Sequence, residues 1–300
     1  WGILLAPVVA IGLFATLGNA LGWRVLFLVG GLPLVVAVVG YFKLPESPRW
    51  LAQHGRAGAA EATVTRLEEE AAASGKALAE IEVRTATPVV KTRFRELFSP
   101  RYRRRTVLTW TQWFCSYFVT YGYTVWLPTL YVKVAGLSVS RSLALTIITS
   151  AIGLASTYTF ALTVDRVGRK RYFTTGFFLG LAGAVLAIVL TATSGHGAWV
   201  PLFVASIPLQ IGIGWSNVGV YLYTPELFPT RMRAWATATG SSMNRIASII
   251  APIAVGAILG AGLGVTSVFV MFGVAAAVGG LVMAVMGVET KGRTLEELSP

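Results

Sequence analysis

The chain has 300 residues, of which 55% are hydrophobic and only 13% are charged. Soluble domains carry about 25% charged residues, so this composition argues against an ordinary soluble protein and points to lipid as the solvent. The net charge is +12, but the basic residues gather in a few separate turns, which is not the pattern of a nucleic-acid-binding surface.

Apolar runs of roughly 20 residues, the length that crosses a bilayer as a helix, recur along the chain. None alternates with period two as the strands of a membrane β-barrel do. Because a backbone in lipid must satisfy its own hydrogen bonds, we predict that each run is a membrane-spanning helix. The eight runs cover residues 2–20, 24–43, 106–128, 142–163, 172–193, 199–223, 234–260 and 264–287.

Lysine and arginine are concentrated on one set of turns, mainly in residues 43–105, 166–171, 231–233 and 291–293. This alternation is the positive-inside pattern, and it predicts that the 44–105 segment and the C-terminus are cytoplasmic. We therefore expect a multi-pass protein of the bacterial inner membrane, in contact with membrane lipids.

The spans divide into two plus six, with a polar segment between them. Its middle, 57–83, is rich in Ala and Glu and predicts one or two cytoplasmic helices. Since the chain starts at Trp1 inside an apolar run, we expect a twelve-span protein whose first four spans precede it. The predicted parts are 1–43 (last two helices of an N-terminal bundle), 44–105 (linker), 106–288 (six-helix bundle) and 289–300 (tail).

Charged motifs stand at the predicted cytoplasmic ends of the spans. Each places a carboxylate beside several cationic groups, and directional Arg–carboxylate pairs of this kind can lock a cytoplasmic mouth and release it. The alternative is that the arginines only anchor to lipid headgroups, which needs no acidic partner. The motifs are PESPRW (45–50), DRVGRKR (165–171), PELFPTRMR (225–233) and ETKGRTLEE (289–297).

In order and spacing these four motifs resemble the major facilitator superfamily, in its sugar-porter-like branch. The resemblance implies an all-α membrane fold, with helices five to twelve of twelve in this chain, and alternating access by rocking of two bundles. One departure is Val288, where sugar porters usually have proline. The resemblance also implies a cytoplasmic gate made of Glu46, Arg49, Asp165, Arg166, Arg169, Glu226, Arg231, Arg233 and Glu289.

The sharper marks of sugar porters are missing. In the third span, Cys115 and Ser116 stand where sugar porters have paired glutamines, and Tyr121 stands where they have an asparagine. In the sixth span, Asn217 and Tyr221 fall in the stretch that reads Gly-Pro-x-Pro-Trp in sugar porters. The amides that would bond sugar hydroxyls are therefore absent from those positions.

The third span instead reads RRRTVL, then Tyr-Gly and WLPTL, which resembles the metabolite:proton symporters, including the nicotinate and aromatic-acid group. Aromatic side chains in a cleft would stack on a flat ring. The competing interpretation of each aromatic residue is helix packing or an interfacial belt.

Arg245 lies 12 residues past Arg233, about 18 Å along a helix, which places it near mid-membrane. A charge at that depth faces a cavity or a partner, and arginine can hold a carboxylate by two parallel hydrogen bonds. The rival interpretation is a structural pair with an acid outside this chain. The predicted substrate-binding residues are Arg245, Asn244, Gln112, Tyr121, Trp126, Asn217 and Tyr221.

We therefore expect a secondary transporter, a proton symporter of a small organic anion that is aromatic or another carboxylate metabolite. Its proton-binding acid would lie upstream, since no span centre holds a carboxylate. The alternatives are a sugar or polyol:proton symporter, a drug or metabolite effluxer, or a transporter-like receptor. We expect no enzyme, metal site or cofactor, a proton gradient as the energy source, a small-molecule substrate as partner, and a monomer.

Overall fold

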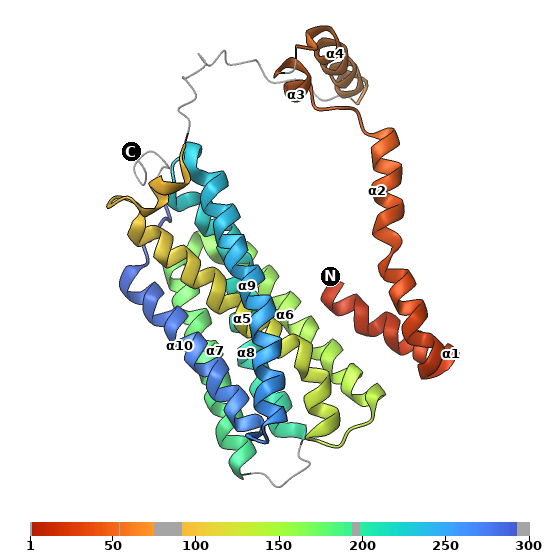
Figure 1. Ribbon diagram of the computed structural model, residues 1–300, viewed down its shortest axis with the longest axis vertical. Coiled ribbons are helices and arrows are strands. Elements are labelled where there is room, and N and C mark those ends of the chain that lie inside the picture. The colour runs from red at the N-terminus through yellow and green to blue at the C-terminus, as the bar shows by residue number, and fades with distance from the viewer. Residues whose placement is uncertain (1, 54, 75–91, 194–198, 293–300) are drawn as a thin grey trace. The chain divides into compact units, whose positions relative to one another are not determined.

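The computed structural model describes residues 2–53, 55–74, 92–193 and 199–292. Within them every regular element is a helix, as the apolar runs predict (Figure 1). Internal contacts divide the chain into two units, one of residues 1–12 with 89–300 and one of 13–88. The first holds a six-helix bundle, and the second holds most of α1 and all of α2, α3 and α4.

The N-terminal helices are α1 (Gly2–Gly30) and α2 (Leu32–Lys43). At Gly18 the backbone leaves helical geometry with a φ of 68°, which only glycine adopts readily, and the helix kinks there. Ala20–Lys43 is long and apolar enough to cross a membrane, as predicted for 24–43, whereas the run before the kink forms a shorter apolar helix, Leu4–Gly18.

The linker holds two short helices, α3 (Pro48–Gln53) and α4 (Ala57–Ala73). Helix α4 confirms a helix in the Ala/Glu-rich stretch. The rest of the predicted 57–83 helical segment, from residue 75 on, lies outside the described residues.

The bundle centres on α8, which packs against α5, α6 and α7, while α5 also packs against α9 and α10, and α7 against α10. Every one of these helices except α5 is apolar enough to span a membrane by length and composition. They are α5 (Arg103–Lys133), α6 (Val139–Val167), α7 (Arg169–Thr193), α8 (Trp199–Leu227), α9 (Arg233–Gly260) and α10 (Gly264–Met286).

Helix α5 coincides with the predicted third span but is less apolar than its neighbours. Two of its polar side chains find partners on neighbouring helices of the bundle. Gln112 Nε2 donates to the carbonyl of Gly279 in α10 (2.9 Å), and Trp113 Nε1 donates to Thr224 Oγ1 in α8 (2.9 Å). A helix held on several sides by protein meets little lipid, so it tolerates polar groups that a lipid-facing helix does not.

Helices α7 and α8 approach closely where two glycines face each other. A Cβ added to Gly212 would lie 2.2 Å from the carbonyl oxygen of Gly176, so no larger side chain fits there. Small residues allow such backbone contact between membrane helices, where the hydrophobic effect does not drive association.

The end of the predicted linker packs on the bundle through the short helix η1 (Phe94–Phe98). Leu97 is fully buried, and its carbonyl accepts a hydrogen bond from Thr106 Oγ1 (2.7 Å). Thr92 Oγ1 donates to the carbonyl of Arg231 in the second short helix, η2 (Thr230–Met232). Residues 92–102 are thus part of the bundle unit, although the sequence pattern placed the boundary at 105.

Candidate functional site

A bidentate ion pair joins the first residue of α7 to the end of α8. The guanidinium of Arg169 donates from Nη2 to Glu226 Oε1 (2.9 Å) and from Nε to both oxygens of the same carboxylate (3.2 Å). Both side chains are largely buried, with 12% and 18% exposed. Nη1 of Arg169 also donates to Asp165 Oδ1 (2.7 Å), whose side chain is 80% exposed. One arginine therefore links three helix ends, α6, α7 and α8.

Glu289, which follows α10, completes this cluster from a fourth direction. Its carboxylate accepts the backbone N–H of Arg169 (2.8 Å) and that of Lys170 (3.2 Å). These are first-turn donors of α7 that have no partner inside the helix, and the positive end of the helix dipole favours the negative charge. The carboxylate occupies the space beside Gly168, where a Cβ would lie 2.5 Å from Glu289 Oε2.

Two further residues belong to the cluster but were not among the predicted site residues. Thr290 Oγ1 donates to Glu226 Oε2 (2.5 Å) with its side chain buried. The Tyr223 hydroxyl donates to the carbonyl of Val288 (2.7 Å) and accepts its N–H (2.9 Å). Thr290 could have been predicted, because it stands within the ETKGR motif. Tyr223 could not, because in the sequence it looks like any aromatic residue of a span.

Arg231 forms a separate ion pair with Glu96 of η1. Glu96 also accepts the backbone N–H of Arg93 (3.0 Å). The Arg93 N–H, and after it the hydrogen bond from Arg231, lower the pKa of the Glu96 carboxyl below its usual value. Arg231 thus fastens the linker end to the start of α9 rather than joining the Arg169 cluster.

The other predicted gate residues are placed separately. Arg233 Nε donates to the carbonyl of Phe228 (3.3 Å). Arg166 has an exposed side chain, and its carbonyl accepts the Lys291 ammonium. Glu46 is exposed between α2 and α3 and Arg49 lies in α3, so both belong to the other unit. Their facing the bundle stays a prediction.

A stack of aromatic rings runs along one face of α5. Trp113 stacks on Tyr117 (centroids 5.8 Å apart, 17°), and Tyr117 on Tyr121 (5.9 Å, 30°). Tyr221 of α8 meets Trp113 edge to face at 4.6 Å. Arg245 of α9 is exposed, and its positive charge acts electrostatically on Tyr117 of this stack.

The stack borders a cavity of about 570 Å³ between α5, α6 and α8. Three predicted substrate residues, Tyr121, Asn217 and Tyr221, line it together. Thr120 Oγ1 donates to Asn217 Oδ1 (3.1 Å), which holds that amide at the wall. The remaining lining residues include Tyr117, Thr124, Val125, Thr157 and Val218.

A second cavity of about 360 Å³ shares Thr120, Thr124, Thr157 and Asn217 with the first. Gln210 of α8 also lines it, with 8% of the residue exposed and Oε1 buried without a hydrogen-bond partner among the described residues. Sequence reasoning missed Gln210, because a glutamine in a span carries no motif that shows which way it faces.

The other predicted substrate residues lie away from the lining of these cavities. Gln112 is buried against Gly279, and Trp126 Nε1 donates to the carbonyl of Pro252 in α9 (3.0 Å). Asn244 is buried, with Oδ1 unpartnered within the described chain. Of these remaining four predicted residues, Arg245 is the one with an exposed side chain.

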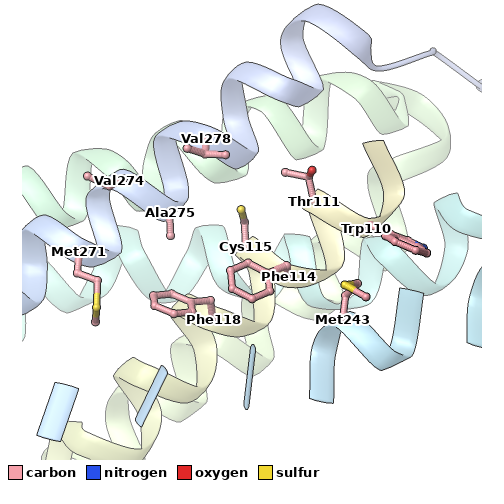
Figure 2. A pocket seen from close by; sticks show the side chains of 10 residues that line it. All are labelled: Trp110, Thr111, Phe114, Cys115, Phe118, Met243, Met271, Val274, Ala275 and Val278. Carbon is pink, nitrogen blue, oxygen red and sulfur yellow. The ribbon is translucent and has the colours of Figure 1, made fainter. Parts of the chain in front are cut away.

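An apolar groove of about 510 Å³ lies between α5, α9 and α10 (Figure 2). Its lining comes from other residues of α5, and it shares no residue with the two polar cavities. Among the described residues, no group of three or more His, Cys, Asp or Glu side chains is placed to hold a metal ion.

The sequence model of the family described as "Sugar (and other) transporter" matches residues 1–300. The chain belongs to this transporter family. It is 32% identical over 289 residues to the niacin transporter NiaP of Acinetobacter baylyi, covering 92% of this chain and 61% of that protein. It is 28% identical over 283 residues to the inner membrane metabolite transport protein YdjE of Escherichia coli, again covering 92% of this chain and 61% of that protein.

Solved structures confirm the major facilitator fold. The proton:xylose symporter XylE, bound to 6-bromo-6-deoxy-D-glucose, matches with a TM-score of 0.64 at 22% identity, over 98% of this chain and 63% of that one. The chain thus spans about 61% of the curated relatives named above. This family membership and the apolar helices make the chain a membrane protein, and these relatives carry transport names, not enzyme names.

Proposed function

We propose that the protein is a secondary active transporter that takes up a small aromatic or other carboxylate metabolite together with protons, by alternating access. The observation that carries the substrate class is Arg245, an exposed cation in the middle of a predicted span, whose charge acts electrostatically on Tyr117 of the aromatic stack. A guanidinium there can bind a carboxylate while the tyrosine rings contact a flat ring.

The similarity to a niacin transporter supports this substrate class, since niacin is an aromatic carboxylate. A relative at 32% identity supports a chemical class of substrate rather than a particular compound. The missing sugar-porter glutamines, replaced by Cys115 and Ser116, point the same way.

A sugar or polyol symporter is the second candidate. The observation that favours it is the polar cavity, in which Gln210 and Asn217 present amides and Thr120, Thr124 and Thr157 present hydroxyls. Such groups bond sugar hydroxyls as well as they bond the polar atoms of a heterocycle.

The Arg169 cluster would act as the cytoplasmic latch of this transporter. Its pairs join the ends of α6, α7 and α8 with the segment after α10, so rearranging them would loosen several helices at once. In this proposal the charged motifs, the 44–105 segment and the C-terminus are cytoplasmic, in keeping with the positive-inside pattern.

The test is uptake by the full-length protein in vesicles, with labelled nicotinate, benzoate, xylose and glucose, each with and without an imposed proton gradient. We expect gradient-dependent uptake of an aromatic acid. Uptake of a sugar and not of an acid would replace the first candidate by the second, and uptake that ignores the gradient would remove proton coupling.

Arg245→Gln and Arg245→Lys test the site itself. We expect Arg245→Gln to lower acid uptake at least tenfold, about 1.4 kcal/mol, with Arg245→Lys recovering a part because it keeps the charge but not the bidentate geometry. Arg141→Gln, an exposed arginine in the first turn of α6, is the matched control and should leave uptake unchanged. Equal uptake by Arg245→Gln and the parent protein would remove Arg245 from the site.

A further inference from the structure

The apolar groove between α5, α9 and α10 has lining groups unlike those of the polar cavities. Figure 2 shows side chains of α5, among them Phe114 and Phe118, in the space between α5 and the α10 residues Val274 and Ala275. The indole N–H of Trp110, one of the few polar groups there, already donates to Thr239 Oγ1 (3.1 Å). The residues that line this groove include no charged side chain.

The groove is continuous with an exposed apolar face of α10. Val274 and Val278 line it and are 59% and 44% exposed, and they share one face of α10 with Val285, which is 72% exposed. In a family whose members cross the bilayer, that face meets acyl chains. The groove is thus open to an acyl chain from the side.

Positive charge stands at one end of the same groove. On α5, Arg104 lies seven residues before Thr111 on the same helical face, about 10 Å away. Arg104 Nη2 donates to the carbonyl of Val285 (3.1 Å), so it bridges α5 and α10 at that end. Arg103 beside it is also exposed. An apolar trough with a guanidinium group near one end is complementary to a lipid with an anionic headgroup.

We propose that this groove is a binding site for one anionic glycerophospholipid. An acyl chain would lie along Phe114, Phe118 and Ala275, and the phosphate would bind Arg104 and Arg103. Arginine suits this role because its planar fork matches phosphate oxygens, and Arg104 has N–H groups beyond the one bound to Val285.

Photo-crosslinking of the full-length protein in phosphatidylcholine nanodiscs tests the site. Each disc contains a small fraction of either phosphatidylglycerol or phosphatidylcholine carrying the same diazirine in mid-chain, and labelled peptides are mapped by mass spectrometry. We expect the phosphatidylglycerol probe to label the α5 and α10 groove peptides at least fivefold more than the phosphatidylcholine probe. Equal labelling by the two probes would overturn the anionic preference.

Variants separate the headgroup contact from the groove. Arg104→Gln should reduce phosphatidylglycerol labelling to the phosphatidylcholine level, and Arg104→Lys should keep most of the preference. Ala275→Trp should abolish groove labelling by filling the trough. Val270→Trp is its control, since Val270 is exposed on α10 but is not among the groove residues. Unchanged labelling of Ala275→Trp, or displacement of the probe by nicotinate, would overturn the proposal.

Discussion

Glu289 accepts a hydrogen bond from the backbone N–H of Arg169 at 2.8 Å, although 120 positions separate them in the chain. The contact fixes the segment after the last helix of the bundle to the first turn of α7. It also links two of the four charged motifs directly, and the Arg169 guanidinium adds a third because it holds Glu226. The cluster is therefore one polar network rather than a row of independent headgroup anchors.

Replacement of Glu289 by alanine should destabilise the bundle by about 1 kcal/mol, because two first-turn N–H groups of α7 lose their acceptor. The measurement is thermal unfolding of the purified protein in detergent. Asp165→Asn is the control, since it removes only an exposed ion pair to Arg169 and should cost at most about 0.5 kcal/mol. Equal losses in the two variants would mean that the cap contributes no more to stability than the exposed ion pair.

Gly168→Ala should reduce stability more than the addition of one methyl group would suggest. Gly168 has a φ of 100°, and the new Cβ would lie 2.5 Å from Glu289 Oε2, so both the backbone and the cap would be strained. We expect a loss of about 1–3 kcal/mol of stability. Gly260→Ala, at a helix end with open space and no positive φ, should be neutral or mildly stabilising. The comparison uses the same unfolding assay.

Arg169→Lys keeps the charge but cannot hold Glu226 by two parallel bonds while also reaching Asp165. We expect transport to fall about tenfold, the equivalent of ~1.4 kcal/mol, with little change in substrate binding measured on the same preparation. Arg166→Lys, whose guanidinium is exposed, should transport normally. A variant at Arg169 that lost binding and transport in parallel would show a general folding defect instead.

The Glu96 contact should depend on pH. Because the folded pKa of Glu96 is lowered, its stabilisation is present above the unfolded value near 4.5 and is lost as the pH falls through the folded value. Hydrogen exchange of the 92–102 peptide should be slower in the parent protein than in Glu96→Gln at pH 6. The two proteins should exchange alike near pH 3, and a difference that persisted there would exclude Glu96 as the cause.

Membrane helices could be predicted wherever a run of apolar side chains was long enough to cross a bilayer. Helix α5 shows the limit of that rule, because it includes the predicted span while its polarity is explained only by partners on α8 and α10. The direction of a polar side chain was not predictable either. Gln112 and Gln210 look alike in the sequence, yet one bonds α10 and the other lines a cavity.

By itself the sequence determined the helical class, the order of the spans, the family and the charged motifs, because span length, charge alternation and short motifs are local properties. Only the tertiary structure decided which motif residues meet. It joined Arg169 with Glu226 and Glu289 and left Arg231 to pair with Glu96, because such pairing depends on how helix ends assemble in space. It likewise gathered Tyr121, Asn217 and Tyr221 around one cavity.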